Sequence, residues 1–120
     1  MTYKDYKDLI VWQKGIELVK SIYEIVNCFP KEDIYALSSQ MRRSAISIPS
    51  NIAEGYKRNS DKDFIHFLTI ANGSLAELET QLIIAIELKM ISIEQAKPAI
   101  DLCREVGKML NSFINTLKQR

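Results

Sequence analysis

Glycine and proline are scarce in this sequence, with four Gly and three Pro among 120 residues, about half the usual share. Because these two residues interrupt regular structure, their scarcity predicts long elements joined by few turns and excludes a fold of many short strands. Cysteine is scarce too. Cys28 and Cys103 stand far apart, which excludes a disulfide scaffold and predicts two reduced, buried thiols.

An excess of charge of one sign is also lacking. Sixteen Lys and Arg balance fifteen Asp and Glu to a net charge of +1, so no strong overall field attracts polyanions. No stretch of about 18 apolar residues occurs, and the first residues lack the apolar run of a signal peptide. We therefore expect a cytoplasmic protein without a membrane partner. Its apolar share of 47% suffices for one core, which predicts a single domain over residues 1–120.

Residues for catalysis are missing from their usual patterns. His66 is the single histidine, so neither cysteine has an obvious base beside it. Asp63-x-x-His66 has the spacing used in di-iron bundle proteins, but the second copy that such a site needs is absent. Phosphate-binding glycine loops and nucleophile elbows are absent as well. We therefore expect a protein that is not an enzyme, with no catalytic residue, no metal and no cofactor.

What the sequence does have is helical periodicity. Apolar residues recur every three or four positions through four segments, which predicts amphipathic helices at 8–28, 31–57, 61–88 and 93–118. Because the connections are short, sequential helices must run antiparallel. The expected fold is an all-α, up-down-up-down four-helix bundle.

Several residues mark the ends and the irregular points of these helices. Pro30 is expected to end the first helix, and Pro49 to bend the second. Ser60 is a predicted N-cap, and Ser92-x-x-Gln95 is a predicted capping box.

Small residues cluster around Gly73 in the third segment. A glycine inside a helix costs about 1 kcal/mol relative to alanine, so we expect another backbone to approach closely there.

One segment is locally basic. Between residues 42 and 62, five cations outnumber two acids, which gives a local net charge of +3. The cations are Arg42, Arg43, Lys57, Arg58 and Lys62. We expect them to lie at one end of the bundle. With Tyr56 as a stacking surface, they form a candidate nucleic-acid site. The alternative is a solvated loop in which Arg42 and Arg43 pair with acids on a neighbouring helix or subunit, such as Glu77.

The N-terminus interleaves aromatic and basic residues, at Tyr3, Lys4, Tyr6 and Lys7, while Asp5 and Asp8 cancel the charge. We expect a loosely packed arm that serves as a contact.

Four strings of this sequence resemble the bacterial family of 23S rRNA intervening-sequence proteins. They are DLIVWQKGIEL, QMRRSAISIPSNIAEGYKR, DFIHFLTIANGSLAELETQL and CREVGKMLNSFI, and together they span most of the chain. The resemblance extends to the accessory variability protein of diversity-generating retroelements. It implies a four-helix bundle whose copies assemble into a five-fold barrel, and relatives that work with RNA through a basic surface.

The resemblance also implies structural or interface roles for the motif residues, which here are Gln40, Arg42, Arg43, Asn51, Glu54, Gly55, Arg58, Phe64, Gly73, Ser74 and Glu77. Arg42 or Arg43 would pair with Glu54 or Glu77, and Asn51 and Gln40 would satisfy backbone groups near the bend.

The expected function is therefore that of a non-enzymatic homo-oligomer, a homopentamer, that binds RNA or a ribonucleoprotein. The alternative is a structural adaptor that binds another protein through its helical faces or barrel ends, with no nucleic-acid role.

Overall fold

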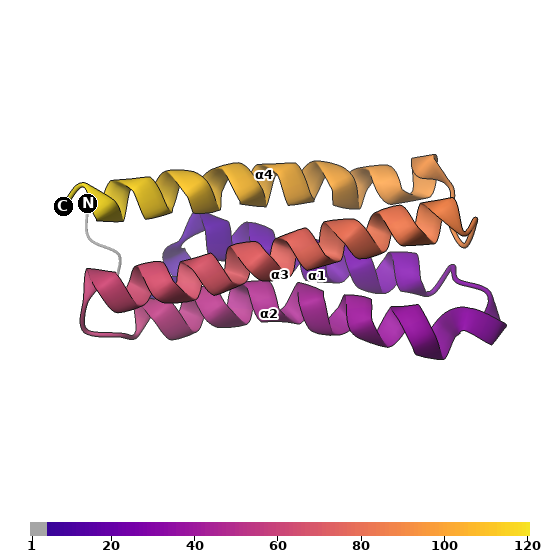
Figure 1. Cartoon of the computed structure of the whole chain (residues 1–120), viewed down its shortest axis with the longest axis horizontal. Coiled ribbons are helices and arrows are strands. Elements are labelled where there is room, and N and C mark those ends of the chain that lie inside the picture. The colour runs from indigo at the N-terminus through magenta and orange to yellow at the C-terminus, as the bar shows by residue number, and fades with distance from the viewer. Residues whose placement is uncertain (1–4) are drawn as a thin grey trace.

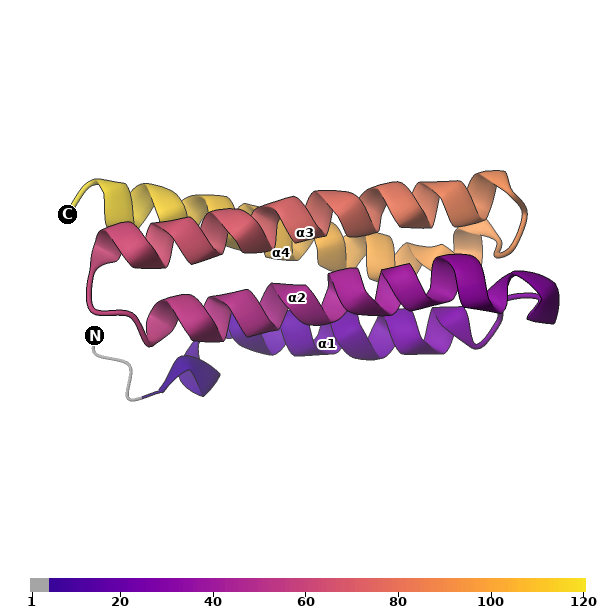
Figure 2. The same cartoon turned by 60° about the horizontal axis from the view of Figure 1, so that its bottom comes forward.

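The computed structural model describes residues 5–120, without the side chains of residues 33–35. Its main elements are four helices, α1 (Ile10–Val26), α2 (Ser39–Tyr56), α3 (Asp61–Glu87) and α4 (Ile93–Lys118). Sequential helices run antiparallel in an elongated bundle of 47 × 22 × 20 Å (Figures 1 and 2). The expectation of an all-α, up-down-up-down four-helix bundle is confirmed.

The helices form a square in which α1 and α3 each contact both α2 and α4. The α2–α3 turn and the C-terminus lie at one end of the bundle, and the α1–α2 and α3–α4 turns lie at the other (Figure 1). We call these the C-terminal end and the far end. Within residues 5–120, each helix is too short or too polar to cross a membrane.

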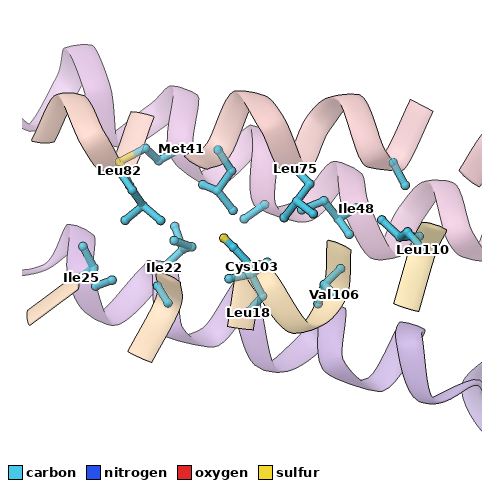
Figure 3. Packing of buried hydrophobic residues seen from close by; sticks show 14 of the residues in the cluster. Leu18, Ile22, Ile25, Met41, Ile48, Leu75, Leu82, Cys103, Val106 and Leu110 are labelled. Atoms are coloured by element: carbon cyan, nitrogen blue, oxygen red, sulfur yellow. The ribbon is translucent and has the colours of Figure 1, made fainter. Parts of the chain in front are cut away.

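The core runs the length of the bundle and takes apolar residues from all four helices. Figure 3 shows side chains such as Leu18, Ile48, Leu82 and Leu110 converging on the space between the helices, and each is at most 1% exposed. Since burying one such side chain stabilises the fold by about 1.5–3 kcal/mol, these rows hold the bundle together.

The predicted caps are confirmed. Ser60 Oγ accepts a hydrogen bond from Asp63 N at 3.1 Å and begins α3. At the start of α4, Ser92 Oγ accepts from Gln95 N at 3.0 Å, while Gln95 Oε1 accepts from Ser92 N at 2.8 Å. These reciprocal bonds satisfy backbone donors that a helix N-terminus leaves without an internal partner.

The helix predicted from residue 31 begins later than expected. Lys31–Asp33 form a 3-10 turn and Ile34–Ser38 form a π-helical turn, and the α-helix starts at Ser39. Apolar spacing could not reveal this. The backbone hydrogen bonds of 3-10, α and π turns span three, four and five residues, and a short apolar pattern is compatible with each of them.

Pro49 lies inside α2, which continues through it to Tyr56. Its ring packs against Gly15 of α1, where an added Cβ would lie 3.4 Å from Pro49 Cβ. Asn51 Nδ2 donates to the Ser47 carbonyl at 2.8 Å and to Ser47 Oγ at 2.9 Å. This side chain therefore binds a backbone acceptor beside the proline, as the family resemblance implied.

The expected burial of Cys28 is wrong, and the close approach expected at Gly73 is not made by the described part of this chain. Cys28 is exposed, because α1 has ended at Val26 and the thiol turns outward, toward the Glu24 carbonyl at 3.6 Å; only Cys103 is buried. Gly73 is exposed as well, and an added Cβ would meet nothing within 4 Å. Within residues 5–120, no backbone of this chain approaches it.

Candidate functional site

The structure divides the predicted basic cluster in two. Lys57, Arg58 and Lys62 lie in and beside the α2–α3 turn, at the C-terminal end. Arg42 and Arg43 lie in the first turns of α2, toward the far end. With a rise of 1.5 Å per residue, about 20 Å of helix separates the two groups. The expectation that all five cations share one end is wrong. Arg42 and Arg43 lie near the start of α2 and the other three cations follow its end, so the length of the helix separates them.

Arg58 is held in place by two contacts. Its Nη2 lies 2.9 Å from Glu54 Oε2, and its guanidinium lies 4.7 Å from the centre of the Phe67 ring. Lys57 and Lys62 are exposed and form no ion pair with any side chain that the structure describes. These two ammonium groups are available to a polyanion at the tip of the turn.

The tertiary structure brings further cations to the same end, which the sequence analysis missed. Lys118 ends α4, and Arg120 follows it, beside the α2–α3 turn (Figure 1). Arg120 Nε lies 3.1 Å from Asp61 Oδ2, so it ties the C-terminus to the start of α3. Apolar periodicity indicates that α4 returns to this end, but not which residues it meets there.

Acids near the turn reduce its positive charge. A hydrogen bond from the Lys7 N–H lowers the pKa of Asp5, and the charges of Lys7 and Lys57 lower it further. Asp5 is therefore an anion that lies within electrostatic reach of Lys57. The region is a set of separate cations rather than a strongly positive surface.

A row of aromatic rings joins all four helices and the N-terminal 3-10 turn η1 (Tyr6–Asp8) at this end. Tyr6 contacts Trp12 and Tyr56, with ring centres 5.6 and 6.5 Å apart. Tyr56 contacts Phe64 at 6.1 Å, and Phe64 contacts Phe113 at 5.1 Å. All four pairs are edge-to-face, the arrangement that the ring quadrupole favours.

Tyr6 is thus packed against the bundle, and the expectation of a loose arm is wrong for the part that the structure describes. Tyr3 and Lys4 lie outside the described residues.

A groove opens beside this aromatic row. Its volume is about 900 Å³, and it runs between the start of α1, the α2–α3 turn and the last turns of α4. Three aromatic side chains line it, those of Tyr56, Phe64 and Phe113, together with Leu9, Val11, Met109 and Leu117. The cations Arg58, Lys108 and Arg120 also line it. Aromatic rings and cations along one groove can hold flat, unsaturated groups that carry negative charge nearby.

The ion pairs implied for Arg42 and Arg43 do not form within this chain. Glu54 binds Arg58 instead, and the Arg42 guanidinium lies over the Tyr23 ring, 5.7 Å from its centre. Among the described side chains, those of residues 5–32 and 36–120, neither Arg43 nor Glu77 takes part in an ion pair.

Other motif residues hold α2 against α3. Gly55 lets the helices approach, because an added Cβ would lie 2.8 Å from Phe67 Cβ and 2.9 Å from Phe64 Cδ1. Ser74 Oγ lies 2.8 Å from Ser47 Oγ, midway along the same pair of helices. Gln40 is exposed. The motif thus includes contacts of the fold itself.

The thiols and the imidazole lie apart from the groove. Burial raises the pKa of Cys103 to about 12, and the Glu79 charge adds to the effect. This thiol is 1% exposed and points into the core (Figure 3). His66 is exposed, and its ring contacts Phe67 edge-to-face at 5.3 Å.

The fold and this end together define a small antiparallel helical bundle with an aromatic, basic groove. The family model of the 23S rRNA-intervening sequence protein matches residues 7–112. The chain therefore belongs to this family, as its sequence strings suggested.

A solved structure agrees with this assignment. The chain is similar to a crystal structure described as a protein with unknown function from the S23 ribosomal protein family of Bacteroides thetaiotaomicron VPI-5482. The two share 30% identity and a TM-score of 0.81, over 87% of this chain and 97% of the other. No curated protein matches the chain.

Proposed function

We propose that this protein is a non-enzymatic RNA-binding bundle that acts as a homo-oligomer, a ring of five copies. Its ligand is RNA, free or within a ribonucleoprotein. The observation that carries the proposal is the groove at the C-terminal end, where aromatic rings and cations lie along one surface.

Single-stranded RNA offers the groups that such a groove can bind. Unpaired bases stack on aromatic side chains, while arginine and lysine bind the phosphates between them. Tyr56 lines the groove, with Arg58 and Lys108 beside it. Lys57 and Lys62 at the turn would extend the contact along the strand. Arg42 and Arg43 lie too far away to join the same short segment.

A non-enzymatic role is supported by the state of the nucleophile candidates. Cys103 is buried with its pKa raised to about 12, so it has little thiolate character near neutral pH. His66 lies on the surface against Phe67, away from both thiols in the sequence. We therefore place the function in binding.

Titration of the protein into a labelled, structured ribosomal-RNA fragment tests the proposal by fluorescence anisotropy. We expect affinity to fall steeply with salt, because bound cations release counterions from the RNA. Arg58→Ala and Lys108→Ala should each weaken binding by roughly 3- to 30-fold. Lys31→Ala is the matched control, since Lys31 is an exposed cation at the far end. Absence of binding at low salt, or equal loss in the control, would refute RNA binding through this groove.

A protein adaptor is the second candidate, and the outer side of α3 favours it. Ile70, Ile83, Ile84 and Leu88 are exposed in or next to this helix. Exposed apolar side chains that gather on one helix mark protein interaction surfaces. A protein that binds no RNA but captures another protein through α3 would fit this function.

A further inference from the structure

We propose that two unlike surfaces of this chain bind each other, so that one copy docks its α3 face onto the α1–α2 face of the next. The α3 face comprises Ile70, Gly73, Glu77 and Ile84. The α1–α2 face comprises Ile16, Val19, Tyr23, Arg42 and Ile46. The inference rests on the self-assembly proposed above and names the surfaces that make it.

The α3 face is an apolar stripe outside the core. Ile70, Glu77 and Ile84 follow one another at seven-residue steps, which return to nearly the same side of a helix. Ile70 and Ile84 are exposed, while the core side of α3 holds other residues, such as Leu75 and Leu82. A helix that is apolar on two sides is suited to pack on two sides.

Gly73 lies between Ile70 and Glu77 on this stripe. An added Cβ there would meet nothing within 4 Å in the described chain. Because a glycine weakens the interior of a helix, its presence calls for a contact that benefits from the missing side chain. A neighbouring copy that approaches the α3 backbone would provide that contact.

The α1–α2 face lies where α2 contacts α1, on the side of α2 away from α3. Ile16, Val19 and Tyr23 follow helical spacing along α1, and the first two are half-buried while Tyr23 is exposed. Arg42 lies over the Tyr23 ring. Ile46, one turn further along α2, is exposed. This surface is also apolar, but its charged group is a cation.

Charge identifies the occupant as a second copy. Glu77 is the acid at the middle of the α3 face, and among residues 5–120 it pairs with no cation. Arg42 has no carboxylate partner among the side chains that the structure describes, and the Tyr23 ring holds its guanidinium in position. An apolar face with an acid and an apolar face with a held cation are complementary. Because the faces differ, the contact is head-to-tail, and such contacts close into rings or extend into filaments.

Native mass at micromolar concentration tests the pairing. Ile46→Asp places a charge in the α1–α2 face, and Ile84→Asp places one in the α3 face, so each prevents docking through that face. Each variant alone should be monomeric while the unchanged protein is not. Mixed in equal amounts, the two variants should form a dimer of twice the 13.8 kDa chain mass, because one intact face remains on each.

Ile83→Asp is the matched control. Ile83 is 60% exposed, more than Ile84 at 39%, but it points about 100° away around the helix. It should leave the mass unchanged. A monomeric mixture, an Ile46→Asp variant that still assembles, or dissociation by Ile83→Asp would each overturn the pairing while self-assembly itself stands. A monomeric unchanged protein would refute both.

Charge reversal gives an independent check. Arg42→Glu and Glu77→Arg should each reduce the native mass, and the two changes in one chain should restore it, since every contact then holds the reversed pair. Failure of the double variant to recover would contradict a direct Arg42–Glu77 contact. Circular dichroism of each variant is the control for folding, and we expect the helical signal of the unchanged protein.

Discussion

Ser47 and Ser74 lie opposite each other midway along α2 and α3, with their hydroxyl oxygens 2.8 Å apart. Ser74 is 9% exposed, and Ser47 also accepts a hydrogen bond from Asn51 Nδ2. This contact fixes how far α2 is shifted along α3. It thereby sets which residues of the two helices meet at the C-terminal end.

Removing this bond should lower stability. Ser74→Ala deletes one partner of a hydrogen bond between helices, and we expect the free energy of unfolding in urea to fall by about 1 kcal/mol. Ser50→Ala is the control, because Ser50 lies exposed on the same helix pair and undergoes the same change in helix propensity. Equal stability of the two variants would contradict a role for the Ser47–Ser74 bond.

The glycines of α2 and α3 should respond to alanine in opposite directions. In Gly55→Ala the new Cβ would meet Phe67 Cβ at 2.8 Å, and forcing the helices apart should cost about 1–3 kcal/mol. In Gly73→Ala the Cβ meets nothing, so the helix should gain about 1 kcal/mol. Urea unfolding of both variants, made in the Ile46→Asp background that is expected to be monomeric, measures both changes. Destabilisation by Gly73→Ala in the monomer would show that an intrachain contact exists at that position.

The two thiols should react at very different rates. Cys28 is exposed and Cys103 is 1% exposed, so a thiol reagent should label Cys28 first. Labelling of Cys103 requires opening of the bundle and should be slower by a factor on the order of 10² or more. The absorbance of the group released from the reagent follows the fast labelling of Cys28 and the slow labelling of Cys103. Cys28→Ala should remove the fast phase alone; two equally fast thiols would contradict the burial of Cys103.

Burial of Cys103 should also make the protein less stable in alkali. Its pKa is raised from 9.0 to about 12 in the folded protein, so between these values the unfolded chain has lost a proton that the folded chain keeps. Stability then falls as pH rises through this window, by up to about 1.4 kcal/mol per pH unit from this group.

Urea unfolding at several alkaline pH values measures this slope. Cys103→Ala should unfold with a smaller dependence on pH, whereas Cys28→Ala should keep the original one. Parallel curves for all three proteins would rule out a linked Cys103 proton.

Local sequence signals predicted the helices because their causes are local. Spacing of apolar residues decides which side of a helix is buried, and Ser60 and Ser92 bind donors within their own first turn. The π-helical turn at Ile34–Ser38 was missed, since its apolar residues fit an α-helix equally well. The exposure of Cys28 was missed because it depends on where α1 ends.

By itself, the sequence determined the four amphipathic helices, their antiparallel order and the family to which the chain belongs. Tertiary structure alone decided that Arg42 lies over the Tyr23 ring, that the row from Tyr6 to Phe113 gathers at one end, and that Arg120 meets Asp61 there. The physical reason is distance along the chain. Periodicity and capping act within a few residues, whereas a groove forms where helix ends far apart in sequence pack side by side.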